Sequence, residues 1–239
     1  MKKIDAKNLN FDTLNELIRK TDGDIIISDC LGQRFIGSGL GSKKIQIEGT
    51  AGNALGAYLD GATITAYGNV QDAVGDTMND GKIIVHGSAG DAVGYAMRGG
   101  EIYVQKNAGY RVGIHMKAYK SKLPVMVIGG TVGSFLGEYQ AGGIIVVLNL
   151  SNEKDIVGKF CGTGMHGGKI FLRTKTEIPS LPPQVHQCKA TKSDLAEIAP
   201  LIKNFCSYFG GDERAILSDA FFVLTPNSNN PYRQLYVEN

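Results

Sequence analysis

The segment Gly162-Thr-Gly-Met-His-Gly167 has the spacing G-x-G-x-x-G that is typical of dinucleotide-binding loops. In such a loop the backbone approaches a pyrophosphate at the start of a helix. Here the following residues, KIFLRT, are typical of a strand. The segment is also in phase with a repeat described below, as is Gly37-Ser-Gly-Leu-Gly41. We interpret both segments as turns and expect this chain to bind no cofactor.

Histidines and cysteines are the other candidates for chemistry. No two of the histidines lie at i, i+4, although His115 and His166 follow repeated glycines by two and four residues and could approach each other on neighbouring corners. Without a carboxylate or cysteine fixed beside them, we expect no metal site. No cysteine pair has C-x-x-C spacing, so we expect reduced thiols, neither a zinc site nor an iron–sulfur cluster, and no catalytic residue. The residues concerned are His86, His115, His166, His186, Cys30, Cys161, Cys188 and Cys206.

Composition narrows the class of protein. Glycine is abundant, with 32 residues in 239 and no Gly-X-Y period, which indicates a folded chain with many tight turns. The net charge of +2 does not favour nucleic acid or an acidic membrane. No apolar run follows the first lysines as in a signal peptide, and none is long enough to cross a membrane. We expect a cytoplasmic protein.

Glycines repeat along most of the chain, in segments such as GTAGNALG, GNVQDAVG and GSAGDAVG. The third glycine of each segment is present in every copy, and we call it the anchor glycine. The first five anchors are nineteen residues apart, and the last two follow after 24 and 25 residues. The seven anchors are Gly37, Gly56, Gly75, Gly94, Gly113, Gly137 and Gly162.

A short strand follows most of these anchors. Apolar residues stand eight and ten positions after them, as at Ile45 and Ile47, and the residue between varies. A unit of nineteen residues has no room for a helical crossover, so only the next copy can cover its inward residues. We therefore predict a mainly β fold, a right-handed parallel β-helix of about seven coils.

The two ends differ from the repeat. Residues 1–34 are predicted to form an N-terminal cap that contains a helix with a possible Asp12 cap, and residues 35–178 the β-helix. Residues 179–239 are predicted to form a linker, cap helices and a tail. We expect α-helical caps at both ends, because open sheet edges invite aggregation.

Two insertions and the tail are candidates for contacts with other proteins. Extra residues follow Gly113, around HMKAYKSKLP, and Val147, around NLSNEKD. Insertions in a solenoid form surface loops, often on the working face. Exposed aromatics and long cations commonly anchor interfaces. We expect the loop 117–124 and the tail 221–236 to contact partners, although the tail could instead fold back on its own chain. The predicted contact residues are Lys117, Tyr119, Lys120, Lys122, Phe222, Tyr232 and Tyr236.

These features together resemble the GXGXG or third domain of glutamate synthase, in the separate-chain form of archaea and anaerobic bacteria. The resemblance covers nearly the whole chain, from GQRFIGSGL through GDAVGYAMRGGEIYV and GYRVGIHMKAY to GTGMHGGKI, YFGGDERAIL and PYRQLY. It implies a non-catalytic scaffold that positions a glutaminase chain and a synthase chain. The synthase chain would hold FMN and an iron–sulfur cluster, and ammonia from glutamine would reach 2-oxoglutarate there.

Two other functions remain open. One is the related β-helix subunit of a formylmethanofuran dehydrogenase-like complex. The other is a β-helix enzyme that processes carbohydrate, which would carry carboxylates along one outward ladder; the outward positions Gln46, Thr65, Ile84, Tyr103, Val146 and Phe171 include none. The sequence does not decide the partners, their stoichiometry or whether the chain self-associates.

Overall fold

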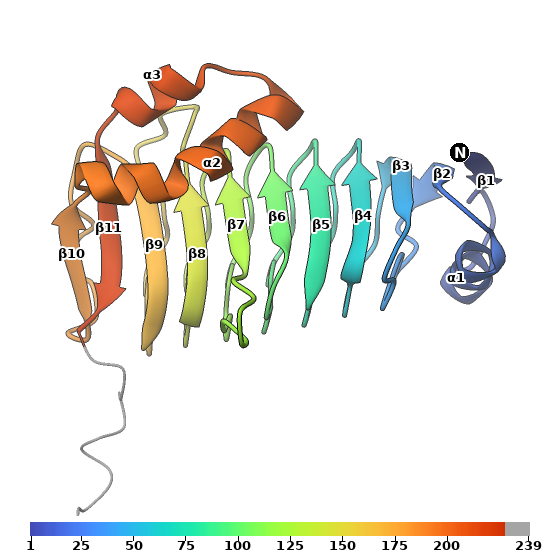
Figure 1. The fold of residues 1–239 in the computed structure, drawn as a ribbon, viewed down its shortest axis with the longest axis horizontal. Helices are drawn as coiled ribbons and strands as arrows, with labels where there is room; N and C mark the ends of the chain where they lie inside the picture. Colours follow the sequence, from blue (N-terminus) through green and yellow to red (C-terminus); the bar gives the residue numbers. More distant parts are fainter. Residues whose placement is uncertain (228–239) are drawn as a thin grey trace, which may run out of the picture.

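A stack of parallel strands forms the body of the protein, which a computed structural model describes over residues 1–227 (Figure 1). Each strand pairs with the next one in chain order, from β1 to β9. A second, shorter set of parallel bridges joins successive coils, for example Ala51 with Val70 and Val70 with Ala89. The stack is a β-solenoid of about eight turns. The strands are β1 (Lys2–Asp5), β2 (Ile25–Leu31), β3 (Lys44–Thr50), β4 (Asp60–Ala66), β5 (Asp80–Val85), β6 (Glu101–Val104), β7 (Val125–Ile128), β8 (Ala141–Val147) and β9 (Gly167–Arg173).

The solenoid begins earlier than predicted. Strand β2 pairs in parallel with β3, and β1 pairs in parallel with β2, so the sheet extends into the predicted N-terminal cap. Strand β7 was not predicted, because the insertion after Gly113 moves it away from the regular interval. Its residue Met126 nevertheless lies opposite both Ile102 and Ile145, in the register of the other coils.

One inward column runs through the whole stack. The aligned residues come from β3 to β9, and each is at most 1 % exposed. Since a strand directs alternate side chains to opposite faces, one such residue per coil is enough to build a continuous core. The column consists of Ile45, Ile64, Ile83, Ile102, Met126, Ile145 and Ile170.

The anchor glycines from Gly37 to Gly137 face this column, and Gly162 faces Val185 of β10. All seven have positive φ, between 63° and 73°. At Gly56 a Cβ would lie 2.6 Å from the Cδ1 of Ile83, so the inward isoleucine of the next coil occupies the space that a side chain would need. The glycine is therefore required both by its backbone conformation and by the packing of the core.

Corner backbones bind the coils on both sides. In the corner around Gly56, the N–H of Gly56 donates to Ile36 O of the preceding coil at 2.9 Å. The N–H groups of Ala54 and Tyr58 donate to Asp72 O and Asp76 O of the following coil, at 2.8 and 2.7 Å. The corners from Gly56 to Gly137 are all held between two neighbours in this way, which satisfies N–H groups that would otherwise be costly to bury.

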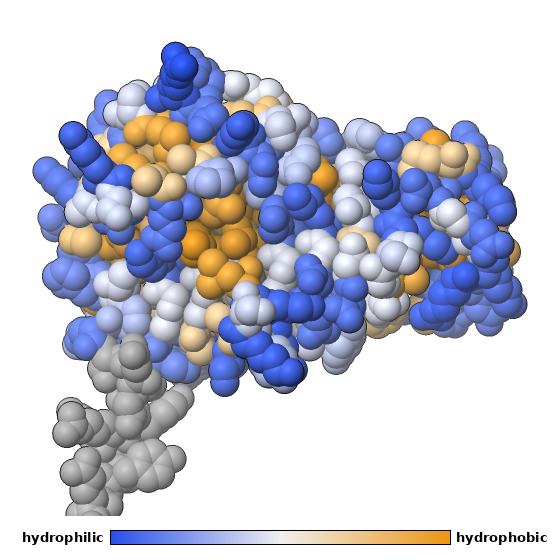
Figure 2. Space-filling view, in the orientation of Figure 1, coloured by the Kyte–Doolittle hydropathy of each residue, from blue (hydrophilic) through white to orange (hydrophobic). Residues whose placement is uncertain are grey.

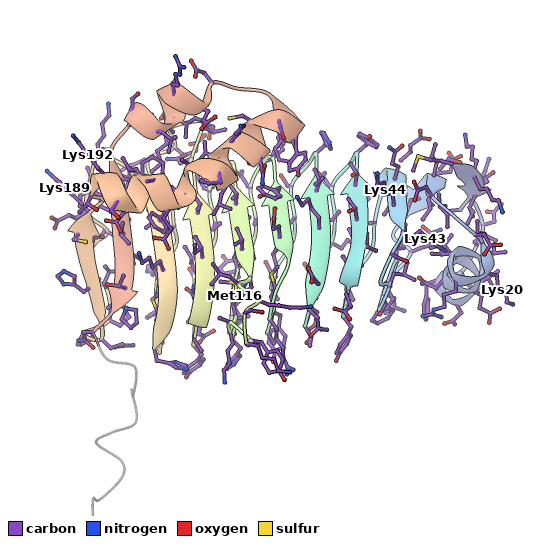
Figure 3. All side chains as sticks on the ribbon, viewed as in Figure 1. Lys20, Lys43, Lys44, Met116, Lys189 and Lys192 are labelled. Carbon is purple, nitrogen blue, oxygen red and sulfur yellow. The ribbon has the colours of Figure 1, made fainter. Side chains whose placement is uncertain are left out.

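Helix α1 (Phe11–Lys20) lies at the N-terminal end of the row of strands (Figure 1). Its N-cap is Asn10 rather than Asp12, because the Asn10 Oδ1 accepts the N–H of Thr13 at 2.8 Å. Lys43, labelled beside α1 in Figure 3, donates to the carbonyls of Ile18 and Thr21 at 2.6 and 2.7 Å. This ammonium lies at the end of the helix where cations are favourable.

The C-terminal end is built differently from the prediction. Two further strands extend the sheet: β11 (Phe221–Pro226) pairs antiparallel with β9, and β10 (Val185–Lys189) pairs antiparallel with β11. The expected α-helical cap over this end is therefore wrong. A chain segment that pairs with β9 covers the open edge more completely than a helix can, because it satisfies the edge backbone groups directly.

The C-terminal helices cover the outer face of the sheet instead. Helix α2 (Lys192–Phe209) runs across β7–β11, with α3 (Glu213–Ser218) beside it (Figure 1). The outward residues Tyr103, Val146 and Phe171 are apolar or aromatic and fully buried, in one cluster with Ile202 and Phe205 of α2. Figure 2 shows apolar surface around these helices and mainly polar surface over β3–β5. The helices therefore cover the part of the sheet whose outer face is apolar.

The packing at Gly56 predicts a ranking of glycine substitutions. Gly94→Val should destabilise the fold by more than about 3 kcal/mol, since it combines an unsuitable φ with overpacking. Gly56→Val should cost still more, because the clash there is with the branched Ile83, whereas Gly94 faces the flexible side chain of Met126. Denaturant midpoints test this against Gly23→Val, where an added Cβ meets nothing within 4 Å. Equal losses at Gly23 and Gly56 would contradict this account of the packing.

A buried amide predicts a stabilising substitution. Gln140 is fully buried and occupies a position where the adjacent coils carry Met116 and Met165. Its Nε2 donates weakly to Gly142 O and Gly143 O, both at 3.2 Å, but its Oε1 has no partner among the described residues. Gln140→Met should stabilise the fold by about 1 kcal/mol, because an unsatisfied buried oxygen is removed.

Thermal unfolding measures this effect, with Met116→Gln as the reciprocal control. That control should destabilise the fold, since it buries a second amide. A lower midpoint for Gln140→Met would mean that the two Nε2 hydrogen bonds outweigh the unpaired oxygen.

Candidate functional site

The first insertion folds back on its own chain. Tyr119 and Lys122 form an antiparallel bridge, with N–H to O distances of 3.1 and 3.0 Å in the two directions. The Lys122 ammonium lies 3.0 Å from the Asp80 carboxylate and 3.4 Å from the Asp60 carboxylate, on the two strands β5 and β4. Lys122, which was predicted to contact a partner, is thus engaged in its own chain and anchors the loop.

The tip of this loop is exposed. Tyr119 is 48 % and Leu123 50 % exposed, and Lys117 and Lys120 are exposed as well. The Lys120 Nζ lies 5.3 Å from the centre of the Tyr119 ring, in reach of a cation–π interaction. Lys117, Tyr119 and Lys120 are therefore accessible to a partner, and their contact with one remains a prediction.

The tail is different from what the sequence suggested. Phe222 is only 3 % exposed and lies in β11, opposite Leu172 of β9 and Lys189 of β10. The prediction that Phe222 is an exposed contact residue is wrong, because residues 221–226 form a strand inside the sheet, between β9 and β10. Tyr232 and Tyr236 lie outside the described residues.

The second insertion, residues 148–155, is held at its base. The Asn149 side chain exchanges hydrogen bonds with the backbone of Glu153, at 2.8 and 2.9 Å. Arg173 at the end of β9 donates to Leu148 O and Asn149 O, and its Nε donates to Asp219 at 2.6 Å. One guanidinium thus joins this loop, the last solenoid strand and the connection between α3 and β11.

The glycine fingerprint at residues 162–167 is a corner of the solenoid. Gly162 has φ 71°, and β9 begins at Gly167, so no helix follows the glycines. Cys161 in the same corner is buried, which raises the pKa of its thiol to about 12. Burial also raises the pKa of the Cys30 thiol. A raised pKa leaves little thiolate at neutral pH, so neither cysteine is a good nucleophile.

Two of the four histidines come together. His115 and His166 line one groove of about 520 Å³ on the corner side of the solenoid, two coils apart and with Tyr139 between them. Lys117, Ala141 and Gly167 complete its lining. Tyr139 and Ala141 were not predicted from the sequence as residues of this groove. The repeat could have indicated them, because they lie two and four residues after Gly137, as His115 and Lys117 lie after Gly113.

The other two histidines lie elsewhere. His86 stacks on Tyr67 with ring centres 5.0 Å apart and meets the edge of Phe209 of α2. Burial lowers the pKa of its imidazole. His186 is exposed on β10. Over residues 1–227, no three His, Cys, Asp or Glu side chains converge as a group that could hold a metal ion. No helix in that range has the length and apolar character needed to cross a membrane.

Comparison with known proteins defines the family. Residues 10–226, which include the strands from β2 to β11, match the family described as GXGXG motif. The chain belongs to the GXGXG motif family. The resemblance to the glutamate synthase-type domain is thereby confirmed at the level of the family.

Two further proteins resemble this GXGXG chain. An uncharacterized protein of Methanocaldococcus jannaschii is 43 % identical, with 98 % of this chain and 95 % of the relative aligned. A chain in the crystal structure of the formyltransferase/hydrolase complex of Methylorubrum extorquens with methylofuran has a TM-score of 0.66 and 19 % identity. The match covers 92 % of this chain and 88 % of that one, and it shows a shared fold.

The contacts of Lys122 predict how the GXGXG chain keeps its loop ordered. Lys122→Gln should speed hydrogen exchange of residues 118–123 with little effect on global stability, because exposed ion pairs contribute little. Lys120→Gln is the matched control, since the Lys120 ammonium lies over the Tyr119 ring and forms no ion pair with the described carboxylates. Equal exchange in both variants would mean that the Lys122 ion pairs do not hold the loop.

The pH dependence of the wild-type loop follows from the same contacts. The hydrogen bond from Lys122 and the Gly81 N–H lower the pKa of the Asp80 carboxyl from 3.8. A lowered pKa in the folded state gives a stabilisation that is present above pH 3.8 and is lost as the pH falls through the folded value. Protection of the loop should therefore persist at pH 5 and decline only in stronger acid.

Proposed function

We propose that this chain is a non-catalytic scaffold subunit of a multi-chain glutamate synthase. It would position a glutaminase chain and a synthase chain so that ammonia from glutamine reaches 2-oxoglutarate. In this proposal FMN and the iron–sulfur cluster belong to the synthase chain, no cofactor binds the scaffold, and the complex is cytoplasmic. The observation that carries the proposal is membership of the GXGXG motif family over residues 10–226.

The solenoid suits the task of holding two proteins at a set distance. Successive strands lie about 4.8 Å apart, so β2 and β9 are separated by roughly 34 Å. The corners from Gly56 to Gly137 are each bonded to the coil before and the coil after, which opposes bending of the stack. Partners docked on different coils would keep a constant separation and orientation.

The outer face of the sheet favours a scaffold role over the role of a carbohydrate-processing enzyme. From β6 onward, the ladder where such an enzyme would hold substrate is covered by α2 and α3 and buried, as at Tyr103 and Phe171. On β3 and β4 the ladder is open, but its residues Gln46 and Thr65 offer no carboxylate. General acid–base cleavage of a glycosidic bond depends on paired carboxylates.

A second candidate is a scaffold in a formylmethanofuran dehydrogenase-like complex. It is favoured by the fold shared with a chain of the formyltransferase/hydrolase complex. The physical role of the solenoid would be the same, and only the partners would differ. The identity of the co-purifying chains therefore decides between the two candidates.

Co-purification from the native source tests the proposal. The tagged chain should retain a glutaminase chain and a chain with a flavin spectrum, and the complex should form glutamate from glutamine and 2-oxoglutarate. Retention of formyl-transferring chains would instead establish the second candidate. Purification of a stable complex with neither set would overturn both.

Variants then locate the interface. Tyr119→Ser with Lys120→Gln should weaken retention about tenfold or more without changing the unfolding midpoint, since aromatic and cationic side chains dominate interface energies. The matched control is Tyr110→Ser with Lys106→Gln, which removes the same types of exposed residue outside the loop 117–124. Equal retention of both variants would show that the loop is not the interface.

A further inference from the structure

We infer that the groove lined by His115, Lys117, Tyr139 and His166 binds a small oxyanion with at least two negative charges, such as a dicarboxylate or phosphate. We call it the corner groove. The inference concerns these side chains alone and does not depend on a role in glutamate synthase.

Two ladders of the repeat form the walls of the corner groove. The first ladder contains the residues two positions after the last three anchor glycines: His115, Tyr139 and Gly164. The second ladder contains the residues four positions after the same anchors: Lys117, Ala141 and His166. Backbone hydrogen bonds fix the spacing between coils: the N–H of Ala141 donates to Met116 O, and that of His166 to Gln140 O, both at 2.8 Å.

Ala141 creates the space between Lys117 and His166. Their backbones are two strand spacings apart, about 9.6 Å, and only a methyl group lies on the coil between them. Earlier coils carry the larger polar residues Asn79 and Arg98 at this position. The resulting gap is wide enough for a carboxylate or phosphate group.

Aromatic packing covers the ring faces along the first ladder. The His115 ring stacks on Tyr139, with centres 5.1 Å apart and planes 10° from parallel, and Tyr95 packs edge-on against His115 at 5.9 Å. The other side of the Tyr139 ring lies directly on Gly164, where an added Cβ would collide with it. A ligand in the groove therefore meets ring edges and polar atoms rather than an open aromatic face.

A hydrogen bond orients His166. Its Nδ1 lies 3.0 Å from Gly164 O, and since a carbonyl only accepts, Nδ1 carries the proton. Nε2 is then the ring nitrogen left for a ligand, and on a neutral ring it accepts a hydrogen bond. The charged donor of the groove is the Lys117 ammonium, and charge-assisted hydrogen bonds to an oxyanion are among the strongest in proteins.

The charges around the corner groove favour an anion over a cation. Its lining includes the Lys117 ammonium, two imidazoles and a phenol, but no carboxylate. The neighbouring acidic residue Glu138, which precedes Tyr139, lies 3.4 Å from the Arg111 guanidinium and is neutralised by it. A metal cation would be repelled by Lys117 and would find fewer than three of its usual ligands here.

Isothermal titration of the full chain at low ionic strength tests this inference, with 2-oxoglutarate and inorganic phosphate as probes and sodium chloride as the blank. Saturable binding of either probe is the expected result, and the preferred probe identifies the ligand as a carboxylate or a phosphate compound. Lys117→Gln should weaken this binding about tenfold or more, through loss of a charged hydrogen bond.

Two further variants separate the corner groove from general charge. Ala141→Leu leaves the charge unchanged but fills the gap, so it should abolish binding while the unfolding midpoint stays close to that of the wild type. Lys106→Gln removes one exposed charge elsewhere and should bind as the wild type does. The inference is overturned if neither probe binds saturably, or if Lys117→Gln and Lys106→Gln bind equally well. If Ala141→Leu does not fold, the comparison of the two lysine variants decides.

Discussion

The contact between an anchor glycine and the inward side chain of the next coil is the constraint on which the rest of the structure depends. At Gly56 this contact brings the Ile83 side chain into the place of a Cβ. The same glycine donates its N–H to the preceding coil. One small residue per turn therefore sets the corner conformation, closes the core and joins three successive coils. A side chain there would disturb all three at once.

This constraint also explains where the chain tolerates insertions. Both insertions fall outside the corners, and strands β7 and β8 return to the common register after the first one. The extra residues must then make their own contacts, and each loop does so through a basic side chain: Lys122 to two carboxylates, and Arg173 to two carbonyls and Asp219. The side chains of Tyr119 and Lys120 stay exposed beside the Lys122 anchor.

The corner groove is a consequence of the same repeat. A solenoid brings residues at equal positions into ladders, so His115 and Tyr139 stack although 24 residues separate them. Lys117 belongs both to this groove and to the start of the first insertion. The inferred anion site and the proposed partner surface are therefore adjacent, since the insertion begins where one wall of the groove ends.

The sequence alone determined the solenoid. The spacing of seven glycines and the alternation of Ile45 and Ile47 repeat within each coil, and contacts between equivalent positions follow from that period. The sequence also indicated where α2 packs. The outward residues are polar at first (Gln46 and Thr65) and later apolar or aromatic (Tyr103, Val146 and Phe171), and an apolar outer face must be buried by another element. The accessibility of the loop tip at Tyr119 also agreed with the sequence.

Only the tertiary structure decided the two ends and the groove. Phe222 looked like a tail residue, but it pairs between β9 and β10, because the last coil offers an edge that no local pattern reveals. Lys122 looked like a free cation, and its partners Asp60 and Asp80 are more than forty residues away. His115 and His166 line one groove across two coils, with Tyr139 and the small Ala141 on the coil between them. These contacts depend on which distant surfaces meet, and a repeat determines that only for positions that are equivalent.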